Sequence, residues 1–152
     1  MENASGELKK ERVILNKELE IALAASYQML SEAGITPEIS IPDEAVVSLL
    51  DQKALQRVFG NILSNAVKYS SGSMSVSLAP DGLILFSNPA PSLSEIEVGK
   101  LFDRFYTVDN AKASTGLGLS IAKLLIEKMG GIIHANYTDG VFEVSVQFEN
   151  LS

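Results

Sequence analysis

Asn61, Asn65 and Lys68 are spaced so that one face of a helix would carry all three side chains. At about 100° per residue, they lie beside an apolar stripe rather than within it. A carboxamide oxygen can ligate Mg²⁺, which prefers oxygen ligands, and an ammonium group attracts phosphate oxygens. The three residues therefore suit an anionic ligand bound together with a hard cation. Alternatively, they form an ordinary solvated helix face.

A second candidate is the stretch at residues 114–121, Ser-Thr-Gly-Leu-Gly-Leu-Ser-Ile, which leads into an amphipathic pattern. Glycine lets a ligand approach the backbone closely, and the first turn of a helix offers unpaired N–H groups. The stretch matches neither the Walker pattern nor the dinucleotide fingerprint, because no Gly-Lys-Ser/Thr follows it and no strand immediately precedes it. It predicts either a phosphate-binding loop or a glycine-rich entry into a helix.

These candidates need helices and strands to hold them in place, and the hydrophobic pattern predicts both. Residues 51–72 form the clearest helix, with Asp51 as its cap and apolar residues at helical spacing. Two further helices are predicted at 11–33, ended by Gly34, and at 121–129. Apolar runs predict strands at 35–41, 46–50, 73–78, 83–86, 132–135 and 141–148.

Together these elements predict an α+β fold, a two-layer α/β sandwich of about three helices on a mixed, mostly antiparallel sheet. The Asp139-Gly140 pair predicts a hairpin between the last two strands. Residues 87–115 are expected to be irregular apart from a short helical stretch near 94–105. A long irregular segment in a compact domain is more often functional than idle.

The composition fits one globular domain at 11–152, preceded by a flexible segment at 1–10. The 152 residues include no cysteine and one histidine, which excludes a thiolate zinc site, a cysteine nucleophile and a multi-histidine metal site. The formal charge of −7 argues against binding to nucleic acid or to an anionic membrane surface. No apolar run approaches the roughly 18 residues of a membrane-spanning helix.

Three segments of the chain resemble sequence boxes of the sensor histidine kinase family. Residues 55–70, LQRVFGNILSNAVKYS, look like the N box, and residues 101–106, LFDRFY, resemble the F box. Residues 115–121, TGLGLSI, resemble the G2 box, and residues 127–131, EKMGG, match the segment that usually follows it. The order and spacing of the boxes agree over nearly the whole chain from about residue 13.

This resemblance implies the ATP-binding catalytic domain of a two-component sensor kinase, with the fold shared by gyrase, heat-shock chaperone and mismatch-repair ATPases. ATP and Mg²⁺ are the implied cofactors, with Asn65 as the metal ligand and residues 107–115 as a short ATP lid. Arg104 is the nearby cation that could meet the γ-phosphate, or else it forms a surface ion pair. The other residues that the resemblance assigns to the nucleotide site are Asn61, Lys68, Tyr69, Asn88, Ala90, Ser92, Phe105, Thr115, Gly116, Leu117, Gly118 and Leu119.

The chain departs from the family at the G1 box, which is Asp-x-Gly-x-Gly in the family and Asn88-Pro89-Ala90-Pro91-Ser92 here. The family's aspartate accepts a hydrogen bond from the adenine amino group. Asn88 can still accept through its carboxamide oxygen, but without charge assistance, at a loss of about 1 kcal/mol in binding. Adenine recognition is therefore weakened, re-routed or retained, and the sequence leaves these alternatives open.

The only histidine, His134, lies in a predicted strand and lacks the helical context of the family's phospho-accepting histidine. The resemblance therefore implies a cytoplasmic fragment of a longer kinase, whose partners are an upstream dimerisation and histidine phosphotransfer domain and, indirectly, a response regulator. No autophosphorylation is expected from the isolated chain, nor direct membrane contact. Two alternatives remain: a nucleotide-free docking module of the same fold, and a serine kinase of the anti-sigma class.

Overall fold

The computed structural model describes residues 8–70, 72–91 and 118–151, which form four helices and seven strands. The helices are α1 (Leu15–Ala25), α2 (Tyr27–Glu32), α3 (Gln52–Tyr69) and α5 (Gly118–Lys128). The strands are β1 (Glu11–Ile14), β2 (Thr36–Ser40), β3 (Val47–Leu50), β4 (Ser73–Leu78), β5 (Leu83–Pro89), β6 (Ile132–Thr138) and β7 (Val141–Gln147).

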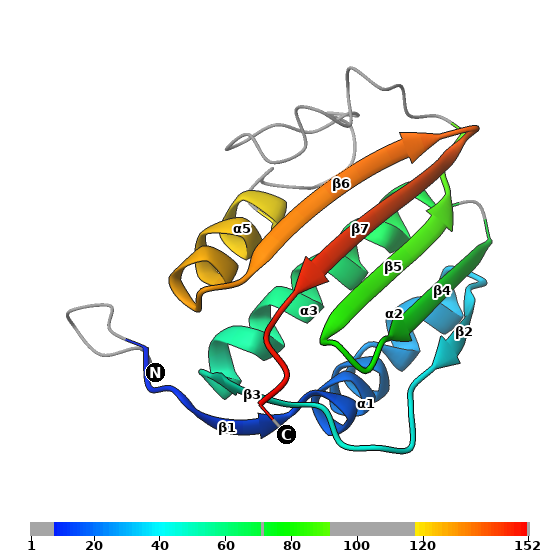
Figure 1. The fold of residues 1–152 in the computed structure, drawn as a ribbon. Helices are drawn as coiled ribbons and strands as arrows, with labels where there is room; N and C mark the ends of the chain where they lie inside the picture. The colour runs from blue at the N-terminus through cyan, green and yellow to red at the C-terminus, as the bar shows by residue number, and fades with distance from the viewer. Residues whose placement is uncertain (1–7, 71, 92–117, 152) are drawn as a thin grey trace.

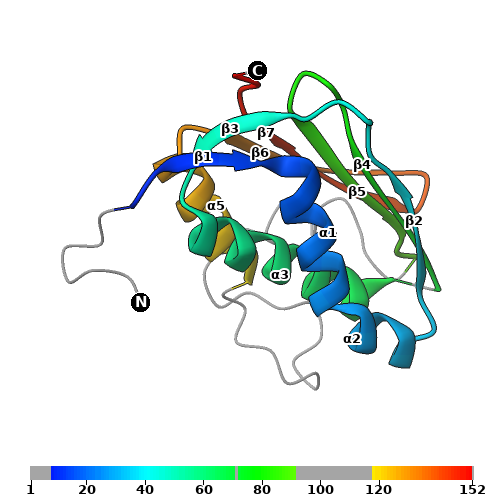
Figure 2. The ribbon, with the colours of Figure 1, turned by 90° about the horizontal axis from the view of Figure 1, so that it is seen from below.

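Five strands form the main sheet in the order β2-β4-β5-β7-β6, and β1 pairs with β3 in a separate two-stranded ribbon. Only the β2–β4 pair is parallel within the main sheet, and the other pairs are antiparallel. All four helices lie on one side of the sheet (Figures 1 and 2). These features confirm the predicted two-layer α+β sandwich on a mixed, mostly antiparallel sheet.

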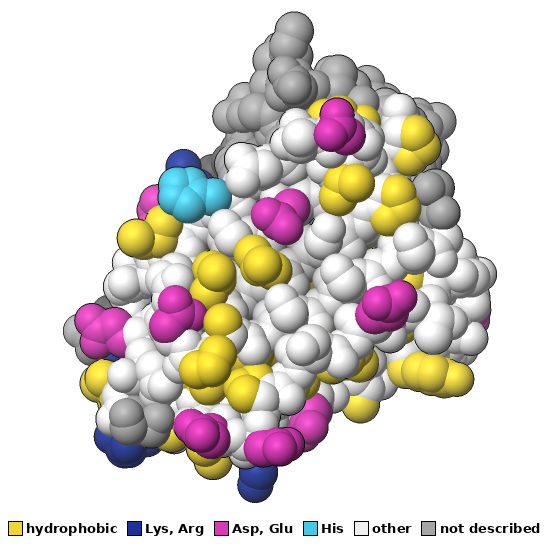
Figure 3. All heavy atoms as spheres, turned by 45° about the vertical axis from the view of Figure 1, so that its right-hand side comes forward, with side chains coloured by type: hydrophobic (Ala, Val, Ile, Leu, Met, Phe, Trp, Pro, Cys, Tyr) yellow, Lys and Arg dark blue, Asp and Glu magenta, His cyan; other side chains and the backbone are white. Residues whose placement is uncertain are grey.

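The hydrophobic core lies between the helices and the sheet. Alternate residues of β5 and β7 are buried, as the period of two in a half-covered strand requires. The rings of Phe59 on α3 and Phe86 on β5 meet with centroids 6.0 Å apart. The other face of the sheet carries no helix from the described segments, and Figure 3 shows it as mainly uncharged, with dispersed acidic side chains.

Local signals fix the ends of the helices. The carboxylate of Asp51 caps α3 by accepting the N–H of Ala54 at 3.0 Å, as the sequence predicts, and it also accepts the N–H of Lys9 at 2.8 Å. Burial raises the pKa of Asp51, but the backbone N–H bonds outweigh it, so the pKa lies below its ordinary value of 3.8. Helix α5 ends where the left-handed Gly130 (φ 84°) donates to the carbonyl of Glu127 at 3.0 Å.

The prediction of one helix over 11–33 is wrong at its start and in its middle. Glu11–Ile14 is strand β1, because it pairs with β3 in a contact that local periodicity cannot reveal. Ser26 then separates α1 from α2. Helix α1 begins directly after β1 with the buried Leu15. The side chain of the next residue, Asn16, connects α1 to the loop before β3 by accepting the N–H of Val46 at 2.8 Å.

Two strands are longer than the sequence predicts. β5 continues to Pro89, where an irregular segment was expected from residue 87, because each added residue pairs with β7. β6 likewise continues to Thr138, up to the predicted hairpin at Asp139-Gly140. The predicted helical stretch near 94–105 and the predicted lid at 107–115 lie outside the described residues. In the described segments, no helix has both the length and the apolar character needed to cross a membrane.

Candidate functional site

The C-terminal half of α3 presents Asn61, Asn65 and Lys68 along one partly buried face, next to the apolar stripe that packs on the sheet. Asn61 joins this face to the start of α5, because its Nδ2 donates to the carbonyl of Gly118 at 3.1 Å. The structure therefore brings together the two segments that the sequence singled out, although 57 residues separate these two positions.

Asn65 carries a polar atom that no described residue satisfies. Its Nδ2 is buried and has no hydrogen-bond partner within residues 8–70, 72–91 and 118–151. A buried unpaired amide group costs about 1–3 kcal/mol, so native structures seldom keep one without a reason. Because this atom lies on the same face as Asn61, one turn further along α3, the geometry fits a side chain kept for a ligand at the α3–α5 junction.

Lys68 and Tyr69 form the last turn of α3. The ammonium group of Lys68 lies 5.4 Å from the centroid of the Tyr69 ring, and the ring itself is buried. A cation in the last turn is favoured by the negative end of the helix dipole. This arrangement holds a positive charge at the same end of α3 as Asn65.

Asn88 and Ala90 lie at the end of β5, on the face of the strand that the helices cover. Asn88 follows the buried Phe86 at a spacing of two and is only 2% exposed. Its Nδ2 donates to the carbonyl of Pro89 at 3.2 Å. Figure 1 shows that β5 and α3 end at the same end of the molecule, so Asn88 belongs to the same region as the polar face of α3.

The backbone of Ala90 is held by the β6–β7 hairpin. Its N–H donates to the carbonyl of Gly140 at 2.8 Å, and its carbonyl accepts the hydroxyl of Tyr137 at 2.9 Å. Tyr137 and Gly140 are not among the site residues predicted from the sequence, and the hairpin signal at Asp139-Gly140 was the only indication that this part of the chain turns back on itself.

Gly118 and Leu119 form the first turn of α5, and Leu119 is buried. Within the described part of the chain, a Cβ added to Gly118 would meet only the backbone oxygen of Asn61, at 3.9 Å, which is an ordinary contact. Packing against α3 therefore does not require glycine here. The other predicted site residues, Ser92, Arg104, Phe105, Thr115, Gly116 and Leu117, lie outside the described residues.

The described residues of this site include no cluster of carboxylates or histidines. In the segments that the structure describes, no group of three or more His, Cys, Asp or Glu side chains could hold a metal ion. His134 is exposed on the edge strand β6, opposite Ser145, which confirms the prediction that it is a strand residue. A cation near α3 would therefore rely on carboxamide oxygens and on oxygens of the ligand itself.

Comparison with known proteins decides the family. The model of the histidine kinase-, DNA gyrase B- and HSP90-like ATPases matches residues 50–150, a range that contains α3, α5 and the whole of β4 to β7. The chain belongs to this ATPase family. The matched range includes every site residue that the sequence analysis assigned to this ATPase domain, and membership of the family implies an ATP site.

Sensor kinases are among the relatives of the ATPase domain. The sensor protein kinase WalK of Staphylococcus haemolyticus is 30% identical over 151 residues, which cover 92% of this chain and 24% of WalK. The sensor histidine kinase YcbM of Bacillus subtilis is 33% identical over 116 residues, which cover 70% of this chain and 37% of YcbM. The chain therefore spans about a quarter to a third of the length of these two relatives.

The fold has close solved counterparts. The structure of the mycobacterial sensor histidine kinase MprB aligns with a TM-score of 0.79 and 22% sequence identity, covering 93% of this chain and 98% of that structure. This likeness confirms the fold that the resemblance implied.

Proposed function

We propose that this ATPase domain is the catalytic domain of a sensor histidine kinase, which holds ATP and presents its γ-phosphoryl group to a histidine on a separate domain. The unpartnered Nδ2 of Asn65, one turn from the bond between Asn61 and Gly118, carries the proposal. It indicates a ligand at the junction of α3 and α5, where the family boxes meet. The names of the relatives WalK and YcbM support a kinase rather than another ATPase.

The residues at this junction fit a magnesium nucleotide. Asn65 would hold Mg²⁺ through its carboxamide oxygen, in keeping with the preference of this ion for oxygen ligands. The ion supplies neutralisation of the phosphate charge. Lys68 would supply a further positive charge at the end of α3, and the positive dipole end at the first turn of α5 would attract an anion. These local devices attract ATP in spite of the net charge of −7.

Catalysis by this domain is positioning and electrostatic stabilisation. The bond from the γ-phosphorus to the leaving oxygen of ADP breaks, and a new bond forms to a ring nitrogen of the accepting histidine. We do not assign this role to His134, because it is exposed next to the buried Ile133 of β6 and therefore lies on the face of the sheet opposite the helices. We propose that the acceptor histidine lies on an upstream dimerisation and phosphotransfer domain, from which the phosphoryl group passes to a response regulator. These steps take place in the cytoplasm, where ATP is available.

One observation favours a second candidate, a docking module of the same fold that no longer binds nucleotide. Asn88 replaces the family's aspartate, and its amide nitrogen is already bonded to the neighbouring carbonyl of Pro89. Ala90 replaces a glycine and is fully buried. Restoring the box with Asn88→Asp, Ala90→Gly and Ser92→Gly distinguishes the two: a kinase domain gains affinity modestly, whereas a degenerate module gains binding where there was none.

Calorimetric titration with ATP and ADP, with and without Mg²⁺, tests the proposal. We expect magnesium-dependent binding with a Kd of about 10–1,000 μM, which corresponds to roughly 4–7 kcal/mol. We expect no radiolabel on the isolated chain after incubation with γ-labelled ATP, but label on a histidine phosphotransfer domain supplied in trans. Absence of nucleotide heat at millimolar ligand contradicts the proposal and supports the docking module.

A further inference from the structure

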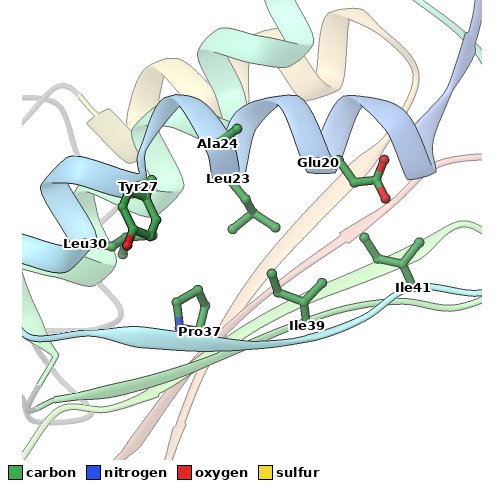
Figure 4. Close-up of a pocket in the computed structure, with 8 residues that line it drawn as sticks. All are labelled: Glu20, Leu23, Ala24, Tyr27, Leu30, Pro37, Ile39 and Ile41. Atoms are coloured by element: carbon green, nitrogen blue, oxygen red, sulfur yellow. The ribbon is translucent and has the colours of Figure 1, made fainter.

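An apolar groove lies between helices α1 and α2 and the edge strand β2. This edge of the sheet is opposite the β6 edge, beside which α5 packs. The groove encloses about 470 Å³. Figure 4 shows Leu23 and Tyr27 pointing down from the helices, toward Pro37, Ile39 and Ile41 of the strand side. Since β2 and β6 are opposite edges of the sheet and α5 packs beside β6, the groove is separate from the nucleotide site.

Large apolar side chains in this groove remain in water. Tyr27 is 71% exposed and Ile39 is 50% exposed, although both line the groove. Their apolar surface stays exposed at a free-energy cost of roughly 25 cal/mol per Å², which an occupant would recover. Exposed apolar surface that is gathered in a groove, rather than scattered, is typical of an interaction site.

The elements that border the groove are acidic. Residues 15–45 carry six acidic side chains and one basic side chain, Lys17, so they account for 1 − 6 = −5 of the net charge of −7. Glu18 does not contribute to the rim, because it is buried and accepts bonds from Gln52 and Gln56. Glu20 lines the groove directly, and the other four acids are exposed. A second copy of this chain would bring the same acidic rim, and an anionic lipid surface would also be repelled, so charge favours a basic protein segment.

The strand edge does not favour the addition of another strand. Pro37 has no N–H, and proline in a sheet is found where that position faces away from the neighbouring strand. The groove runs from Pro37 to Ile41, about 13 Å along β2 at roughly 3.3 Å per residue. A helix of about nine residues covers the same length, with apolar side chains at i, i+3 or i+4 and i+7 facing the groove.

We propose that this groove binds an amphipathic helix of a partner protein, with its apolar face on Leu23, Tyr27 and Ile39 and a lysine or arginine beside Glu20. The partner's recognition chemistry is thus an apolar stripe flanked by positive charge. None of the residues that line the groove belongs to α3 or α5, so occupation of the groove and of the nucleotide site can occur together.

A designed probe tests this proposal on the chain as it stands. The probe is a 14-residue leucine–lysine peptide with its leucines at i, i+3, i+4 and i+7, and its two controls are the same residues in scrambled order and a leucine–glutamate peptide with the same spacing. We expect saturable binding of the first peptide by fluorescence anisotropy, with ¹⁵N amide shifts confined to α1, α2 and β2. Equal binding of the scrambled peptide, or shifts spread over the open face of the sheet, overturns the proposal.

Two matched pairs of variants locate the binding. Ile39→Ser is compared with Ile21→Ser, because Ile21 is 49% exposed on α1 but does not line the groove. Glu20→Lys is compared with Glu38→Lys, because Glu38 is exposed on the edge strand β2 but does not line the groove. We expect Ile39→Ser and Glu20→Lys each to weaken peptide binding about tenfold and their controls less than about twofold.

Circular dichroism melts confirm that the four variants remain folded. If Ile21→Ser weakens peptide binding as much as Ile39→Ser does, the groove is not the binding site. If sedimentation shows a dimer that Ile39→Ser dissociates, the groove is occupied by a second copy of the chain and the proposal of a basic partner helix is wrong.

Discussion

Asn65→Ala and Asn61→Ala make the same chemical change at two positions of α3, one turn apart, yet we expect opposite effects on stability. Asn61 loses the bond from its Nδ2 to the carbonyl of Gly118. Asn65 loses a buried Nδ2 that has no hydrogen-bond partner among the described residues. Because both changes exchange asparagine for alanine inside one helix, the gain in helix propensity, up to about 0.7 kcal/mol, cancels when the two variants are compared.

The size of the difference follows from the hydrogen bonds alone. Loss of the bond at Asn61 lowers the free energy of unfolding by about 1 kcal/mol. Removal of the unpaired amide at Asn65 relieves at least about 1 kcal/mol of desolvation. The Asn65→Ala variant is therefore more stable than Asn61→Ala by about 2 kcal/mol. For a chain of this length, 1 kcal/mol shifts Tm by about 2–4 °C, so the two melting temperatures differ by about 4–8 °C.

Nucleotide binding completes the test, because a residue kept for a ligand lowers the stability of the free protein and raises its affinity for the ligand. We expect Asn65→Ala to melt at or above the parent chain and to bind Mg·ATP at least about tenfold more weakly, equal to about 1.4 kcal/mol. Thermal melts without nucleotide and calorimetry with Mg·ATP measure the two quantities separately. If Asn65→Ala melts below Asn61→Ala and still binds Mg·ATP normally, then Asn65 is a structural residue and the reasoning from its unpartnered nitrogen is wrong.

Three further predictions concern the cap, the core and the first turn of α5. Asp51→Ala removes the cap of α3 and lowers the free energy of unfolding at pH 7 by about 1 kcal/mol. Because the pKa of Asp51 in the folded state lies below the ordinary 3.8, this stabilisation is present above pH 3.8 and is lost as the pH falls through the lowered pKa. In urea denaturation at acidic pH, we expect the difference in unfolding free energy between the parent and the variant to shrink, and a constant difference contradicts the cap assignment. Phe86→Ala removes a buried ring that contacts Phe59 and lowers the free energy of unfolding by about 3–5 kcal/mol, measured by urea denaturation, and a loss below about 1 kcal/mol is incompatible with this core. Gly118→Ala changes Tm by no more than a few degrees, because the added methyl group makes only an ordinary contact with the described residues. If phosphate approaches this backbone, the variant binds Mg·ATP about tenfold more weakly in calorimetry. Unchanged affinity would show that phosphate does not approach it.

Much of the fold could be predicted because its signals are local. The α3 helix shows its cap, its apolar stripe and its polar face within one stretch of sequence, and the structure confirms all three. Strand β1 could not be predicted, because residues 11–14 run directly into the helical period of Leu15, Leu19 and Ala22, and only pairing with β3 makes the segment a strand. The predicted strand ended too early at Phe86 for a similar reason, since the Ser, Pro and Ala content from residue 87 predicts an irregular segment until the pairing of β5 with β7 is known.

In the candidate site, too, the features with local sequence signals were predicted and those that arise from tertiary packing were not. The polar face of α3 and the glycine-rich entry to α5 were recognised from residue types and spacing, but not their meeting through Asn61 and Gly118, which depends on helix packing. The burial of Asn88 and the anchoring of Ala90 by Tyr137 were likewise out of reach, because they arise from the sheet register between β5, β6 and β7. The groove beside β2 gave no sequence signal, since Ile39 reads as an ordinary inward strand residue.

The central claim is that Mg·ATP binds at the junction of α3 and α5. Titration of the ¹⁵N-labelled chain with Mg·ATP, following the side-chain NH₂ signals of Asn61 and Asn65, tests it most directly. We expect saturable shifts of both signals that EDTA reverses, with Asn65 moving more because its Nδ2 has no partner among the described residues. Signals that stay unmoved at millimolar Mg·ATP, or that move only as much as those of exposed asparagines elsewhere, contradict it.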